Sequence, residues 1–249
     1  MGGEEASEAP ADEVKGWRIV RWGSFVVLVL LGPLIYAFAY EANSFLRSNV
    51  IPLLVSWFTF GLLVYVLVDV FLLHGTTFFL EVFEHEVGHS LAGLLFWRHT
   101  EKMVVEQKQG ATLIPTRNPL IILAPYYLSL FTVPLLPLKL FLPPSVREVV
   151  NFLIGFTLGF HYVSLAREFR PDQSDIQKAG FPFSLCVTFI LNLIFLVVVI
   201  CVVADDYSGI PAFFKDSFVR APEYYEAVWQ AIIEALSGAR GAADSLKGL

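Results

Sequence analysis

Long apolar runs separated by short polar breaks dominate the pattern of this chain. Six segments each approach or exceed the roughly 20 residues that a helix needs to cross the hydrocarbon of a bilayer. They span residues 22–40, 50–73, 76–97, 119–142, 148–168 and 181–204. Short connections between helices place them antiparallel in a bundle. The pattern therefore predicts an all-α polytopic membrane protein with about six transmembrane helices.

One break and one apolar segment depart from this simple pattern. The longest internal break, Arg98 to Asn118, contains two short extended runs around Lys108-Gln109-Gly110. Such a run–turn–run arrangement predicts a small β-hairpin after the third segment. The fourth apolar segment carries prolines at positions 119, 125, 134 and 137. Proline removes a backbone donor, so we expect broken or kinked backbone there that neighbouring helices must satisfy.

Composition agrees with the bilayer as the main environment of the chain. Apolar residues make up 56% and charged residues 16% of the sequence, and its mean hydropathy is +0.64. These values lie far from those of soluble domains, so we expect an integral, multi-pass membrane protein. The net charge of −6 gives no basis for nucleic-acid binding. Cys186 and Cys201 would lie roughly 22 Å apart along one helix and cannot pair within it.

The two ends of the chain differ from its middle. We expect a flexible N-terminal tail over residues 1–21, a six-helix transmembrane domain over 22–204 and a polar C-terminal tail over 205–249. Within that tail, Glu223 to Leu236 alternates apolar and acidic positions at helical spacing. The spacing predicts an amphipathic helix that packs on the rest of the protein or on a second copy of the chain. A homo-oligomer is therefore among the expected partners.

The candidate chemistry lies in the third apolar segment, which contains His85-Glu86-Val87-Gly88-His89. Two histidines four residues apart share one face of a helix and can bind one zinc ion, while the glutamate between them stands beside the water that the ion activates. Zinc lowers the pKa of that water toward 7. Glu86 can then take its proton during attack on a peptide carbonyl and return it to the leaving amine.

The setting of this motif makes a chance match less plausible. Ionisable residues are costly at membrane depth and tend to be functional there. This one segment carries Glu81, Glu84, His85, Glu86 and His89. The sequence therefore predicts that these side chains line a wet cavity and that Zn²⁺ is the cofactor.

The third zinc ligand stays open at this point, because two histidines need at least one more protein ligand. His161 is one candidate, since counting residues along the third and fifth segments places it at a depth similar to that of His89, near 20 Å. Asp175 is another, provided that the loop after the fifth segment folds back into the bundle. Glu168, followed by Asp172, has the Glu-x-x-x-Asp spacing of some membrane-bound zinc proteases and is the remaining candidate.

The motif helix, a following hairpin with Gly110 and a later Asp-containing segment together resemble the site-2 protease family of intramembrane zinc proteases, in its divergent bacterial-type branch. The resemblance covers roughly residues 76–195, and only its H-E-x-x-H portion is highly specific. It implies His85 and His89 as ligands, Glu86 as base and Asp175 as third ligand. The chain departs from the family's Leu-Asp-Gly run, since Asp175 is followed by Ile176.

The resemblance also implies how a substrate is held. In the family, a hairpin after the motif helix holds an unwound substrate, so residues 102–115 are expected as a substrate edge, with Val104, Val105 and Gly110 as binding residues. The expected partners are a transmembrane protein substrate and the lipid bilayer. Two other hypotheses for the function remain: an inactive membrane scaffold or pseudo-protease, and a metal transporter. A transporter needs no general base between its histidines, so Glu86 argues against it.

Overall fold

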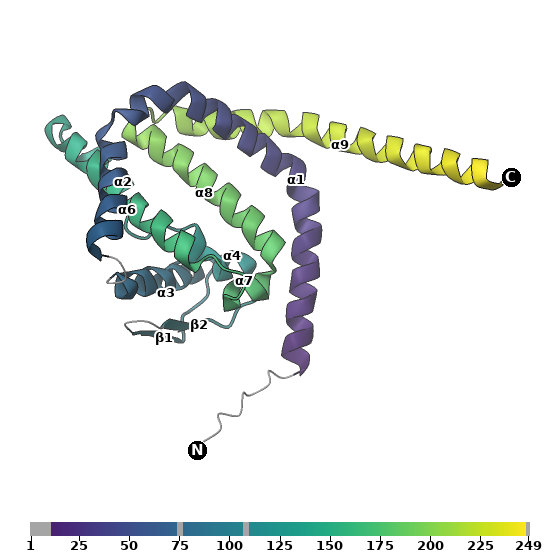
Figure 1. The fold of residues 1–249 in the computed structure, drawn as a ribbon, viewed down its shortest axis with the longest axis horizontal. Coiled ribbons are helices and arrows are strands. Elements are labelled where there is room, and N and C mark those ends of the chain that lie inside the picture. The colour runs from purple at the N-terminus through teal and green to yellow at the C-terminus, as the bar shows by residue number, and fades with distance from the viewer. Residues whose placement is uncertain (1–10, 74–76, 107–109, 248–249) are drawn as a thin grey trace, which may run out of the picture.

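The protein is mostly helical, with one small antiparallel hairpin (Figure 1). This computed structural model describes residues 11–73, 77–106 and 110–247. The elements, in chain order, are α1 (Ala11–Leu54), α2 (Trp57–Val68), the π-helix η1 (Asp69–Leu73), α3 (Phe78–Leu95), β1 (Lys102–Val105), β2 (Gly110–Leu113), α4 (Pro119–Ile122), the 3-10 helix η2 (Ala124–Tyr126), α5 (Leu135–Phe141), α6 (Pro144–Glu168), α7 (Ser174–Ala179), α8 (Phe181–Val203) and α9 (Gly209–Lys247).

Two of the described helices, α6 and α8, are long and apolar enough to cross a membrane. A third span is added if Leu30–Leu54 and Trp57–Leu72, which meet at a bend of 79°, act together. These helices agree with a membrane protein. The structure supports two or three spans by length and composition, and not the six that the apolar runs predict.

Charge and proline explain why two of the predicted spans are missing. The third segment does form a helix, α3, but its 18 residues include three glutamates, which do not suit the lipid interior. The fourth segment is divided among α4, η2 and α5. Pro119 begins α4, Pro125 lies in η2 and Pro134 precedes α5, so each piece has a proline at or near its start, where the missing N–H costs no helical hydrogen bond.

The first predicted helix is longer than its apolar run. α1 continues from Ala11 to Leu54, through the second half of the predicted N-terminal tail and through the polar break at 41–49. That break contains no glycine or proline, so nothing in it ends a helix. Residues 1–10 of the predicted tail lie outside the described residues.

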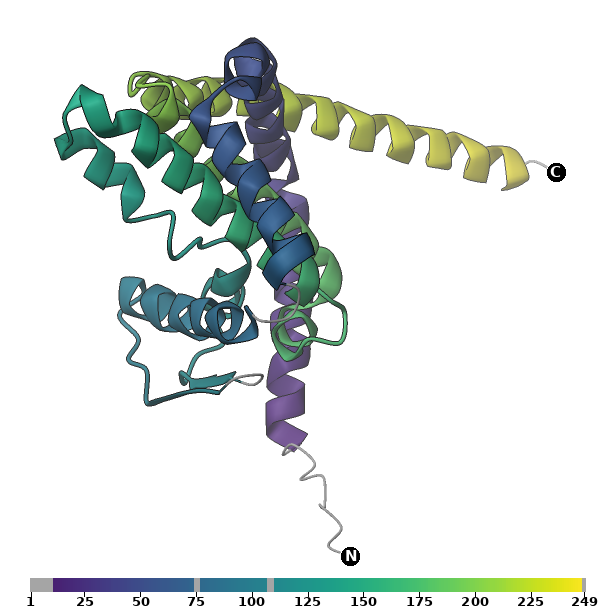
Figure 2. The ribbon, with the colours of Figure 1, turned by 60° about the vertical axis from the view of Figure 1, so that its left-hand side comes forward.

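The hairpin prediction is confirmed. β1 pairs antiparallel with β2, with Lys102 opposite Leu113 and Val105 opposite Gly110. The turn residues 107–109 lie outside the described part of the chain. Figures 1 and 2 show α3 lying beneath α2 and α6 and running across their direction, with the hairpin beside it.

Glycines let α2 and α6 pack in direct backbone contact. A Cβ at Gly61 would collide with the backbone oxygen of Phe152, and one at Gly155 with that of Phe58. Small residues allow such close approach between helices in membranes, where packing rather than water exclusion drives association. This close packing fixes the position of α6 relative to α2.

A buried charge network ties the end of α6 to the start of α3. Arg167 contacts both carboxylate oxygens of Asp69 in η1 and donates to Oε1 of Glu81 at 2.6 Å. The hydroxyl of Thr77 donates to the same Oε1 at 2.6 Å. Asp69 and Glu81 are only 2% and 3% exposed, and buried charges persist only when they are paired. Three elements are thereby held together beside the motif.

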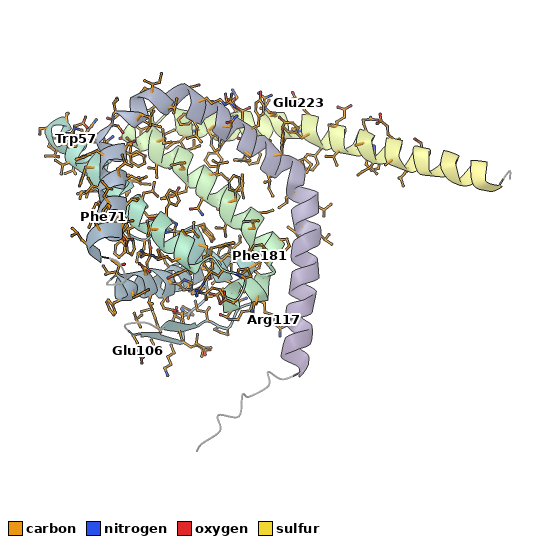
Figure 3. All side chains as sticks on the ribbon, viewed as in Figure 1. Trp57, Phe71, Glu106, Arg117, Phe181 and Glu223 are labelled. Atoms are coloured by element: carbon orange, nitrogen blue, oxygen red, sulfur yellow. The ribbon has the colours of Figure 1, made fainter. Side chains whose placement is uncertain are left out.

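The predicted amphipathic helix is part of α9, which extends away from the bundle (Figures 1 and 3). Its first half crosses α1, where Tyr224 packs edge-to-face on Tyr36 and the Tyr225 hydroxyl donates to the carbonyl of Leu30. Farther on, Trp229 is 61% exposed and Leu236 is 60% exposed. A helix therefore covers these residues, and its large apolar side chains from Trp229 to Leu236 are exposed.

Candidate metal centre

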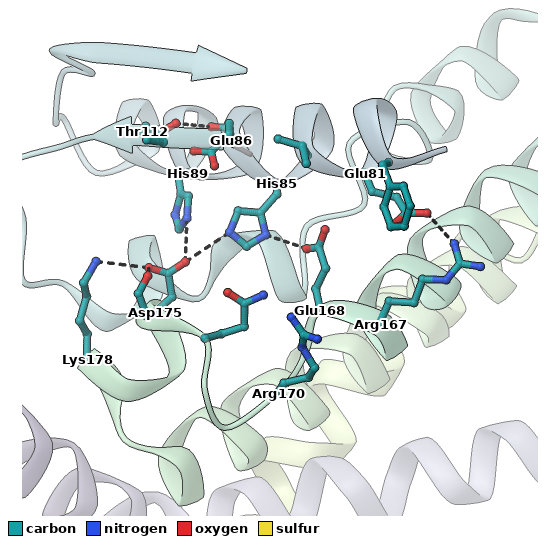
Figure 4. A pocket seen from close by; sticks show the side chains of 16 residues that line it. Glu81, His85, Glu86, His89, Thr112, Arg167, Glu168, Arg170, Asp175 and Lys178 are labelled. Carbon is teal, nitrogen blue, oxygen red and sulfur yellow. Dashed lines mark hydrogen bonds and ion pairs between the residues drawn. The ribbon is translucent and has the colours of Figure 1, made fainter. Parts of the chain in front are cut away.

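The motif histidines turn their Nε2 atoms toward one carboxylate oxygen. His85 and His89 lie one turn apart on α3, and their Nε2 atoms are 3.3 Å and 3.2 Å from Oδ2 of Asp175 (Figure 4). Asp175 belongs to α7, which follows α6 after a short loop. Within the described part of the chain, each of these three side chains offers one possible metal-ligand atom, and these atoms lie within 4.8 Å of one another.

The spacing of these atoms fits a zinc ion. Zinc takes nitrogen and carboxylate ligands at about 2.0–2.2 Å in a tetrahedron, so two ligand atoms on one edge lie about 3.4 Å apart. The two Nε2–Oδ2 distances of 3.3 Å and 3.2 Å are close to that edge. Two imidazoles and one carboxylate also leave a fourth position for water, as catalytic zinc sites do.

The other ring nitrogens show which atoms are available to an ion. Nδ1 of His89 lies 3.0 Å from the carbonyl oxygen of Ile121, and Nδ1 of His85 lies 2.8 Å from Oε2 of Glu168. A carbonyl and a carboxylate accept hydrogen bonds, so each Nδ1 donates. In the neutral tautomers each Nε2 then carries a lone pair. These two lone pairs face a carboxylate oxygen, an arrangement that a shared cation satisfies.

Asp175 faces the two histidines with only one of its carboxylate oxygens, Oδ2. Its other oxygen, Oδ1, lies 3.5 Å from Nζ of Lys178 and accepts from the Ser174 hydroxyl at 3.4 Å. Burial favours the neutral acid, but the two imidazoles that face Oδ2 outweigh it and hold the pKa of Asp175 below its usual range. The carboxylate therefore stays charged at neutral pH.

Glu86 points into the same region from the hairpin side of α3. Its side chain is 6% exposed, and its backbone carbonyl accepts from the Thr112 hydroxyl of β2 at 3.3 Å. The backbone of Gly110 lies directly against the Glu86 side chain, since a Cβ there would be 2.6 Å from Glu86 Cγ. The hairpin thus confines the carboxylate beside the metal-binding cluster.

A cavity of about 720 Å³ opens onto this cluster, and its lining includes His85, Glu86, His89 and Asp175. A second cavity of about 480 Å³ adjoins it along β2 and residues 113–117, and shares His89 and Asp175. The two cavities together make a groove that passes the cluster. The volume of the larger cavity is ample for water beside the histidines.

Of the predicted substrate residues, Gly110 lines the larger cavity, whereas Val104 and Val105 of β1 line neither. β2 lies between β1 and the groove, because β1 pairs with one edge of β2 and residues of β2 line both cavities. Within the described residues, the strand edge at the groove therefore belongs to β2 rather than to β1.

His161 does not reach the cluster. It is 1% exposed inside the bundle, and its Nδ1 lies 3.5 Å from Oε1 of Glu84, which also accepts from the backbone N–H of Leu130. The prediction that His161 lies at the depth of His89 requires the third and fifth segments to lie side by side and to run in the same direction. Because α3 crosses α6 instead, equal counts along the two helices do not bring His161 to His89.

Sequence reasoning missed the partners that hold the two imidazoles. The sequence suggests Glu168 only as a metal ligand, through its spacing to Asp172. The Ile121 carbonyl carries no signal in the sequence, because every residue has one. Glu81, which stands one turn before His85, is paired with Arg167.

Comparison of the chain with protein-family models, with curated proteins and with solved structures finds no match.

Proposed function

We propose that this protein is a zinc-dependent endopeptidase that cleaves membrane-embedded or juxtamembrane proteins. The observation that carries the proposal is the meeting of His85, His89 and Asp175 beside a confined Glu86, at the groove formed by the two cavities. The sequence resemblance to the site-2 protease family supports the same assignment. The apolar helices α6 and α8 support a membrane location, and we propose a multi-pass topology.

The residues of the chain divide the chemistry among them. His85, His89 and Asp175 would hold the ion with Nε2, Nε2 and Oδ2. A zinc ion bound there would polarise water and lower its pKa toward 7. Glu86 would take a proton from the water that attacks the scissile carbonyl and would deliver it to the amine nitrogen when the C–N bond breaks.

The groove suggests how a substrate is presented. A transmembrane helix must unwind before its carbonyls can react, and an unwound strand can add to an exposed strand edge through main-chain hydrogen bonds. β2 provides that edge on the side of the cluster. We therefore place the substrate along β2, which replaces β1 as the expected binding strand.

Metal removal tests the proposal directly. Purified protein in detergent is incubated with a fluorogenic unstructured peptide and with a labelled transmembrane peptide, before and after treatment with 1,10-phenanthroline. We expect cleavage to disappear on chelation and to return on addition of zinc, whereas the non-chelating isomer 1,7-phenanthroline has no effect. Cleavage that survives removal of the ion, or zinc-loaded protein that cleaves neither peptide, would contradict the proposal.

The contact between Gly110 and Glu86 gives a second test. Alanine at position 110 would push the Glu86 carboxylate out of place, and a displacement of about 1 Å in a reacting group can lower activity roughly 10²-fold. We expect Gly110→Ala to lower kcat by about that factor and to leave zinc content unchanged. The control is Gly32→Ala, whose new Cβ meets nothing within 4 Å. Wild-type kcat in Gly110→Ala would argue against this position for Glu86.

A further inference from the structure

Glu168 lies on the opposite side of the His85 ring from Asp175 (Figure 4). Its Oε2 is 2.8 Å from Nδ1, whereas Oδ2 of Asp175 is 3.3 Å from Nε2. The two nitrogens of an imidazole point in widely different directions, so an ion on Nε2 is out of reach of a carboxylate on Nδ1. The geometry therefore excludes Glu168 from the set of ligands that meet at Asp175.

We propose that Glu168 is a positioning residue that holds His85 as a zinc ligand. This inference rests on the proposed metal centre. By accepting the Nδ1–H hydrogen bond, Glu168 fixes the tautomer in which the Nε2 lone pair faces Asp175. A carboxylate in this place also makes the imidazole a stronger donor to a metal.

The two histidines are held by acceptors of different charge. His89 donates to the neutral Ile121 carbonyl at 3.0 Å, and His85 donates to the carboxylate of Glu168 at 2.8 Å. The carbonyl only orients its ring, whereas Glu168 both orients His85 and places negative charge beside its Nδ1.

The two arginines near Glu168 in the sequence contact other carboxylates. Arg167 is bound to Asp69 and Glu81. Arg170 is 3.8 Å from Asp172, and its side chain is 59% exposed. The pairing of Arg167 also anchors the last turn of α6, which fixes the position of the adjacent Glu168.

Zinc affinity of the purified protein tests the inference independently of peptide cleavage. Loss of a carboxylate partner of a ligating histidine typically weakens metal binding 10- to 100-fold. We expect Glu168→Ala to show a loss of about that size, measured by competition with a chromophoric chelator. Glu168→Gln keeps an acceptor oxygen without the charge, so its affinity is expected between those of Glu168→Ala and the wild type. The absorption spectrum of the Co²⁺-substituted protein should change in both variants.

Asp172→Asn is the matched control, because it removes one negative charge near the cavity from a side chain that is 75% exposed and does not touch His85. We expect wild-type affinity there. Thermal unfolding of each variant in detergent separates loss of the metal site from loss of the fold. If Glu168→Ala does not fold, the isosteric Glu168→Gln decides.

Affinity within about twofold of the wild type in folded Glu168→Ala, or in Glu168→Gln when Glu168→Ala does not fold, overturns the inference. Wild-type affinity in Glu168→Gln together with a loss in Glu168→Ala keeps the orienting role and overturns the contribution of charge. A wild-type protein that binds zinc but cleaves no peptide removes the proposed protease function and leaves this measurement valid. The two proposals therefore fail in different ways.

Discussion

Replacing Glu86 by glutamine is expected to lower peptide cleavage about 10²- to 10⁴-fold, the usual contribution of a general base. Glutamine has nearly the same size and shape as glutamate, so it fits the space against Gly110. It cannot accept the proton of the attacking water. Because Glu86 lies outside the group formed by His85, His89 and Asp175, the variant should keep its zinc.

The measurement is kcat/KM on the fluorogenic peptide, together with zinc content by elemental analysis. Glu101→Gln is the control, since Glu101 is exposed beside the hairpin and is not part of the cavity lining. Undiminished cleavage in Glu86→Gln would show that this carboxylate moves no proton in the reaction. Loss of zinc would show instead that Glu86 is a ligand, and the roles of Glu86 and Asp175 would have to be exchanged.

The helical pattern and the motif could be predicted from the sequence because both depend on neighbours along the chain. Apolar runs predict where α6 and α8 lie within a few residues, and a spacing of four places His85 and His89 on one face of α3. The hairpin also follows from local signals, which are two extended runs around a turn. These features need no knowledge of how the helices are arranged.

The arrangement of the helices could not be predicted in this way. Hydrophobic length indicates that a segment can be buried, but it does not give its direction. The crossing of α3 beneath α6 depends on the backbone contact at Gly61 and Gly155 and on the network around Arg167. That crossing separates His161 from the motif. The same packing brings the end of α6, with Glu168, to His85.

The residues alone leave Asp175 as one of several candidates, and only the family resemblance favours it, because an aspartate in a connecting loop is usually solvated or caps a helix. Its short helix, α7, packs into the bundle through Ile176 and Ala179, both of which are fully buried. Their burial turns the preceding residue toward α3. Two apolar neighbours therefore determine where this carboxylate lies, and neither of them carries a functional signal.

The largest effect on metal binding is expected from Asp175→Ala. A directly bound ligand contributes more than an outer partner, so the loss of zinc affinity should exceed the 10- to 100-fold that outer partners produce. The variant should emerge from desalting without zinc, and cleavage should fall to background. Asp175→Asn should bind more weakly than the wild type, because an amide oxygen is neutral.

His161→Gln is the matching test for the other candidate ligand, because the sequence predicts that His161 lies at a depth similar to that of His89. Glutamine can still donate a hydrogen bond to Glu84, which keeps the buried partner of His161 satisfied. Because the His161 Nδ1 contacts Glu84 outside the cluster, this variant should retain wild-type zinc content even if its thermal stability falls. The reverse result, with zinc lost in His161→Gln and kept in Asp175→Ala, would mean that the ion lies deeper in the bundle between α3 and α6. Glu86 would then face a groove without a metal, and the reaction proposed for this groove would have no activated water.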